Sequence, residues 1–118
     1  MNTITEKAAT VLDCLKAGKI LVETGWTQGE FSRGADGKSS TYDKATCWCL
    51  AGAVNTSTSR MAVRSQTYRA LRMAHPDRPD TNGFLVHWND DPARKQEEVV
   101  ALFQTAIRME EANAQHAG

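Results

Sequence analysis

The side chains best suited to catalysis occur in the order Gln28, Cys49, His87 and Asn89. A papain-like thiol enzyme uses, in that order, an oxyanion donor, a nucleophile, a base and a residue that orients the base. A cysteine near the start of a helix gains the lowered thiol pKa that this chemistry needs. We expect Cys49 to lie in the middle of a helix instead, as a buried structural thiol. The residues therefore favour a protein that is not an enzyme. The alternative is a small enzyme or small-ligand binder with a pocket near Gln28, Cys49 and Asn89.

A metal site is the second chemistry that these residue types would permit. Zinc accepts cysteine and histidine ligands, and the chain offers Cys47, Cys49, His75 and His87. On a helix Cys47 and Cys49 point to different sides, so they cannot bind one ion together. The sequence also lacks a phosphate-binding glycine loop and a serine-hydrolase elbow. We therefore expect neither a metal ion nor another cofactor.

Basic side chains gather in one part of the chain. The window from Lys44 to Pro76 contains no acidic residue, whereas Asp and Glu are frequent after it. A helix expected over residues 59–74 carries the arginines of this window, which are Arg60, Arg64, Arg69 and Arg72. An arginine-rich helix surface binds anionic partners such as nucleic acid or an acidic protein. The alternative is a solvated surface that pairs with the acidic C-terminal helix.

Composition places the chain among soluble globular proteins. Its 118 residues are enough for one domain, which we expect to span residues 1–118. No apolar run reaches the ~20 residues that cross a bilayer, and the N-terminus does not resemble a signal peptide. The three cysteines are then expected to be reduced thiols in the cytoplasm. The 14 basic and 14 acidic side chains cancel, and this low net charge favours a homo-oligomer.

Capping and turn signals predict the elements that would position these residues. A capping box at Thr3–Glu6 and a glycine stop at Gly18 bound the first helix, and Asp91-Pro92 opens the last one. Asp36-Gly37 is typical of the tight turn of a β-hairpin. The expected elements are helices over 3–17, 43–54, 59–74 and 92–113, a hairpin over 31–39 and a loop over 77–83.

The uncharged stretch Cys47–Ala53 is the expected centre of the fold. It lies within the helix predicted over 43–54, and its small residues allow other segments to approach closely. Apolar side chains of the last helix recur at helical spacing and form a stripe that a core would bury. We therefore expect a mainly helical α+β fold of about four helices around a central cysteine-containing helix, with a minor β-hairpin.

Short motifs follow one another along the chain. They are Gly25-Trp26-Thr27-Gln28-Gly29, Cys49-Leu50-Ala51-Gly52-Ala53 and Trp88-Asn89-Asp90, followed by Glu98-Val99. In order and spacing they resemble the motifs of a family of small proteins of unknown function from actinobacteria and bacteriophages. The resemblance singles out a candidate pocket that consists of Trp26, Gln28, Cys49, Trp88, Asn89 and Asp90.

The resemblance implies no particular activity. The phage association is a habitat and not a mechanism, and it is compatible with a role in host takeover or in blocking a defence system. We expect a non-enzymatic binding module that contacts a host protein or nucleic acid. Its expected contact surface is the arginine-bearing side of the helix over 59–74.

Overall fold

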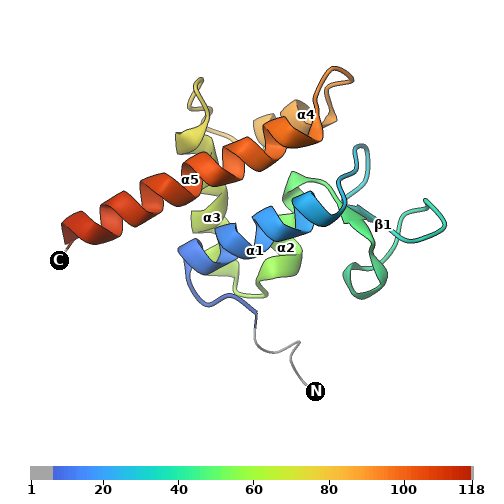
Figure 1. The fold of residues 1–118 in the computed structure, drawn as a ribbon, viewed down its shortest axis with the longest axis horizontal. Coiled ribbons are helices and arrows are strands. Elements are labelled where there is room, and N and C mark those ends of the chain that lie inside the picture. Colours follow the sequence, from blue (N-terminus) through green and yellow to red (C-terminus); the bar gives the residue numbers. More distant parts are fainter. Residues whose placement is uncertain (1–6, 118) are drawn as a thin grey trace.

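The computed structural model describes residues 7–117, and the fold is mainly helical (Figure 1). The helices are α1 (Val11–Thr24), α2 (Leu50–Ser57), α3 (Met61–Ala74), α4 (Asn82–Asp90) and α5 (Gln96–Ala117). A 3-10 turn, η2, covers Tyr42–Lys44, and a two-stranded antiparallel sheet joins β1 (Ser32–Arg33) to β2 (Cys47–Trp48). This arrangement confirms the expected mainly helical α+β class.

One core lies between the helices, and α5 runs alongside α1 in the opposite direction (Figure 1). Every helix contributes fully buried side chains, among them Leu15, Val54, Leu71, Leu85 and Phe103. The stripe predicted for the last helix is buried as expected, because Val99, Phe103 and Ala106 are almost inaccessible to solvent. The C-terminal half of α5 continues past α1, away from the sheet (Figure 1).

The first helix begins and ends later than the sequence predicts. Thr10 caps α1, since its hydroxyl accepts a hydrogen bond from the Asp13 N–H at 3.1 Å, and the predicted capping box lies outside the described residues. The predicted stop at Gly18 is wrong. A Cβ at Gly18 would lie 2.7 Å from Cε1 of Phe103, so the glycine permits close packing of α1 against α5 rather than ending α1.

The helix predicted over 43–54 begins only at Leu50. The residues before it form the 3-10 turn Tyr42–Lys44 and the strand Cys47–Trp48. Cys47 and Trp48 are extended and pair with β1, and the Trp48 N–H donates to the Gly25 carbonyl at 2.9 Å. These long-range backbone bonds override local helix propensity. Once it begins, α2 is the expected buried helix, because Leu50 and Val54 are both inaccessible to solvent.

The expected turn at Asp36-Gly37 is present, but the sheet is not the predicted hairpin over 31–39. Gly37 has a φ of +80°, and the Gly34 N–H donates to the Lys38 carbonyl at 2.9 Å. Ser39 adds a single bridge to Arg33, whereas β1 forms its ladder with β2. The segment from Gly34 to Thr46 is therefore a broad loop that projects from the helical body (Figure 1).

The second half of the chain follows the prediction in α3 and departs from it around α4. The predicted stop of α3 at His75 is confirmed. The predicted loop over 77–83 is interrupted, because Thr81 caps α4 by accepting the Phe84 N–H at 3.3 Å. Asp91 likewise caps a separate turn through the Ala93 N–H at 2.9 Å, so α5 begins at Gln96 rather than at Pro92. In the part of the chain that the structure describes, no helix has the length and apolarity to span a membrane.

Candidate functional site

Asn89, at the end of α4, is the centre of the hydrogen-bond network that joins the motif residues. Its side chain is 1% exposed. The amide oxygen accepts from Nε1 of Trp26 at 2.8 Å and from the Leu50 N–H at 3.1 Å. The amide nitrogen donates to the Thr27 carbonyl at 3.2 Å. One buried amide therefore connects the loop after α1, the start of α2 and the end of α4.

Gln28 and Asp90 close the same loop against α4. Nε2 of Gln28 donates to the carbonyls of Asn89 at 2.8 Å and of Asp91 at 2.7 Å. The carboxylate of Asp90 accepts from the Gly29 N–H at 3.0 Å. These bonds satisfy carbonyls that the end of a helix leaves without partners. The amides of Gln28 and Asn89 are thus engaged in holding the fold together.

Cys49 is the N-cap residue of α2, and not a mid-helix residue as expected. Its Sγ accepts a hydrogen bond from the Gly52 N–H at 3.3 Å, and the residue is 5% exposed. Burial raises the pKa of the Cys49 thiol, the N–H groups of Gly52 and Ala51 act against this rise, and the charge of Asp90 adds to it. Burial thus disfavours the thiolate form that a nucleophile needs.

The motif glycines are required by close approaches of backbone. A Cβ at Gly52 would collide with the carbonyl oxygen of Phe31, and a Cβ at Gly25 would collide with that of Thr46. The same Phe31 carbonyl accepts the Cys49 N–H at 3.0 Å, which fixes the loop over the start of α2. Gly29 has a φ of +82°, a conformation that favours glycine.

This framework leaves a small pocket, called here the Phe31 pocket. Its volume is about 160 Å³, and its lining consists of Gly29, Glu30, Phe31, Cys49, Val86 and Asp90. Two of these residues are carboxylates, and no basic residue in the described part of the chain lines the pocket. The Phe31 side chain is 53% exposed although it is large and apolar. The pocket thus combines negative charge with an apolar wall.

The six candidate pocket residues therefore separate into three groups. Cys49 and Asp90 line the Phe31 pocket, whereas Trp26, Gln28 and Asn89 form the framework behind it. Trp88 lies elsewhere: the guanidinium of Arg94 stacks 4.1 Å from its ring centroid, and the His75 ring packs edge-on at 5.4 Å.

The candidate pocket derived from the sequence lacks four residues of the Phe31 pocket, namely Gly29, Glu30, Phe31 and Val86. Phe31 gives one usable signal, because it is an isolated large apolar residue at the start of the segment predicted as a hairpin, with polar or small residues around it. Nothing local in the sequence indicates that Glu30 and Val86 meet at one pocket.

The arginines predicted to form a binding surface do not lie together. Arg64 donates to the carbonyls of Thr58 and Asn55, each at 2.8 Å, and so braces the end of α2. Arg72 donates to the Asn82 side chain at 3.0 Å. Arg60 and Arg69 are exposed, but their spacing places them on opposite sides of α3. That an anionic partner binds here stays a prediction.

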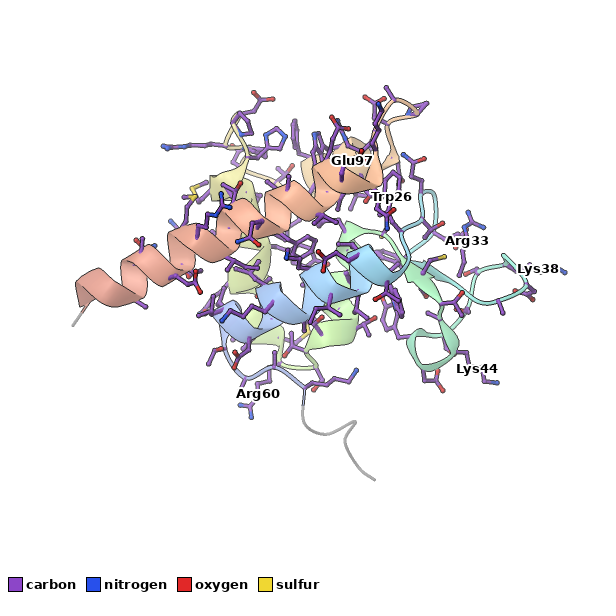
Figure 2. All side chains as sticks on the ribbon, in the orientation of Figure 1. Trp26, Arg33, Lys38, Lys44, Arg60 and Glu97 are labelled. Atoms are coloured by element: carbon purple, nitrogen blue, oxygen red, sulfur yellow. The ribbon has the colours of Figure 1, made fainter. Side chains whose placement is uncertain are left out.

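Other basic side chains are equally dispersed. Arg33, Lys38 and Lys44 lie on the projecting loop region, far from Arg60 (Figure 2). Arg33 is held within that region, since its Nε donates to the Thr27 hydroxyl at 2.9 Å. Over the described residues, these side chains form no continuous basic track of the kind that follows a nucleic-acid backbone.

The cysteines, the metal-ligating side chains and His87 also bear on what chemistry the site could perform. Cys14, Cys47 and Cys49 are free cysteines. Among the side chains that the structure describes, no three of His, Cys, Asp or Glu are grouped so that they could hold a metal ion. His87, the base that a thiol enzyme would need, has an exposed side chain and does not line the Phe31 pocket.

Comparison with known proteins places the chain in a family but assigns no activity. Residues 4–109 match a family of unknown function, DUF6197. No curated protein and no solved structure matches the chain. The match carries no information on source, so the actinobacterial or phage origin stays a prediction. Because the matched region covers most of the sequence, the protein belongs to the family of unknown function DUF6197.

Proposed function

We propose that this protein is a non-enzymatic binding module that holds a protein partner at the Phe31 pocket. The observation that carries the proposal is the pocket's construction. The motif residues fix the loop over 25–31 against α2 and α4, and they leave an exposed Phe31 beside two carboxylates. An exposed aromatic side chain on a rigid support is typical of a protein-binding surface.

The site supports binding better than catalysis. A thiol nucleophile needs a lowered pKa and a base within hydrogen-bond reach. Burial raises the pKa of Cys49, and His87 is not at the pocket. The alternative of a small enzyme therefore has less support than a module that binds without changing its ligand.

The charge of the pocket favours a basic side chain of a protein over nucleic acid as the ligand. Glu30 and Asp90 repel phosphate groups but attract an arginine or a lysine. An arginine fits best, because its planar guanidinium pairs with a carboxylate and also stacks on an aromatic ring such as Phe31. We therefore propose an arginine of a host protein as the group that enters the pocket.

The biological setting belongs to the same proposal. A protein of phage or prophage origin that acts in the cytoplasm would use this pocket to capture a host protein. Host takeover or the blocking of a defence system are roles of this kind. Binding alone is sufficient for them, because occupying a partner's surface prevents its normal contacts.

Affinity capture from host lysate with matched variants tests the proposal. Phe31→Ala removes the exposed ring, and Asp90→Asn removes a charge while keeping an oxygen that can accept the Gly29 N–H. Ile20→Ala is the control, since Ile20 is 61% exposed on α1 and does not line the pocket. We expect a captured protein that is lost with Phe31→Ala and Asp90→Asn and kept with Ile20→Ala. The same captured proteins in all four samples, or nucleic acid as the captured species, would refute it.

A further inference from the structure

A second depression lies far from the Phe31 pocket, where the C-terminal half of α5 passes over α3 and the start of α1. This α3–α5 groove has a volume of about 390 Å³. Its apolar lining includes Val11, Ala70, Met73 and Met109, and charged residues line it as well, namely Arg69 and Glu110. The sheet and its projecting loop lie at the other end of the molecule (Figure 1). The groove is therefore independent of the proposed binding site.

Met109 and Met73 make the groove a surface that another apolar group can enter. Met109 is 38% exposed, which is high for a large apolar side chain on a packed helix. Methionine side chains are flexible and polarisable, so they adapt to whatever group packs against them. Part of the apolar lining of the groove is therefore exposed to solvent.

The charges at the groove are opposite, and they are not paired with each other. Arg69 belongs to α3 and Glu110 to α5, so they stand on the two walls. Among the described residues neither forms a salt bridge, whereas Lys16, Lys19 and Arg94 do. A surface that carries one cation and one anion on opposite walls is complementary to a second copy of itself.

We infer that two copies of the chain associate through the α3–α5 groove around a twofold axis. In such an interface each contact occurs twice. Met109 of each copy packs into the groove of the other, and Arg69 of each copy pairs with Glu110 of the other. The zero net charge of the chain adds no general repulsion between the copies.

Charge reversal of the purified full-length chain tests the inference by sedimentation equilibrium over a range of concentrations. Arg69→Glu and Glu110→Arg should each raise the dimer dissociation constant by about tenfold or more, because each puts like charges opposite one another. The double variant Arg69→Glu with Glu110→Arg should recover most of the wild-type affinity, since the pairing is restored with its signs exchanged. Arg108→Glu is the control, because Arg108 is exposed on the same helix but does not line the groove.

A further variant tests the apolar contact between Met109 of one copy and the groove of the other. Met109→Lys should give a monomer that retains the wild-type circular dichroism spectrum, because Met109 is partly exposed in the single chain. A wild-type chain that is monomeric at every concentration would overturn the inference. So would a double charge-reversal variant that stays as weak as the single ones, or an Arg108→Glu variant that dissociates as readily as Arg69→Glu.

Discussion

Replacement of Asn89 by alanine should be among the most destabilising single changes in this protein. The change leaves the partly buried Nε1 of Trp26 and the buried Leu50 N–H without their shared acceptor. At roughly 1 to 2 kcal/mol for each stranded donor, the free energy of unfolding should fall by about 3 kcal/mol. That is a large fraction of the ~5 to 15 kcal/mol that stabilises a typical domain.

Urea denaturation followed by tryptophan fluorescence measures this loss. Ser65→Ala is the control, because Ser65 is exposed on α3, lines neither the Phe31 pocket nor the α3–α5 groove, and such surface changes stay within about 0.5 kcal/mol. Trp26→Phe removes one of the donors and keeps an aromatic ring, so it should cost about 1 kcal/mol. The double variant should lose less than the sum of the single changes, since the two side chains share one bond.

A loss below about 1 kcal/mol for Asn89→Ala would show that solvent replaces the amide at little cost. The network would then not be what holds the loop after α1 against α4. Additive effects of Trp26→Phe and Asn89→Ala would lead to the same conclusion, because additivity means that the two side chains do not interact in the folded state.

Two further changes test the construction of the site. Gly52→Ala should lower the urea midpoint markedly, because the added Cβ collides with the backbone carbonyl of Phe31. Gly37→Ala should lower the midpoint only through the backbone φ of +80°, since no atom lies within 4 Å of an added Cβ there. Equal effects of the two substitutions would contradict the close approach at Gly52. Burial raises the pKa of the Cys49 thiol and of the Tyr68 hydroxyl, so the folded protein keeps protons that the unfolded chain releases. The stability that these groups contribute is complete below about pH 8 and should be lost as the pH rises through their folded pKa values. Urea midpoints measured at a series of alkaline pH values should therefore fall, and Cys49→Ser, which keeps a capping oxygen, should fall less steeply. A midpoint that stays constant up to pH 11 would exclude this explanation.

The elements that the sequence predicts well are those set by local periodicity. In α3 the buried residues Val63, Thr67 and Leu71 recur at helical spacing, and His75 before a proline ends the helix. The apolar stripe of α5 and the turn at Asp36-Gly37 are likewise set by residues close in sequence. Each depends on neighbours within one or two helical turns, so a reading of the sequence can find it.

The predictions that failed concern residues whose role is set by distant segments. Gly18 has the local signature of a helix stop, but Phe103 lies against it and the helix continues. Trp48 is extended because its N–H donates to the Gly25 carbonyl and its carbonyl accepts the Thr27 N–H, both far from it in sequence. Cys49 was not recognised as a cap, because cysteine is not among the residues preferred at that position.

The candidate site was predictable only as a group of residue types. The motifs name Trp26, Gln28 and Asn89, and the structure joins these three residues in one hydrogen-bond network. Their roles could not be derived, because the same amides could serve a ligand or the backbone. The structure shows them bound to backbone groups and to each other, and it places the accessible chemistry at Glu30, Phe31 and Asp90 instead.

The position of Asn89 in the chain also dictates when the Phe31 pocket can exist during biosynthesis. Its bond to Trp26 spans 63 residues, and contacts so distant in sequence form late in folding. A ribosome delivers the loop after α1 long before it delivers α4, so the nascent chain carries that loop without its anchor. The pocket is therefore assembled only when the polypeptide has emerged beyond Asp91, and a truncated translation product that stops before α4 would have no means of binding through it.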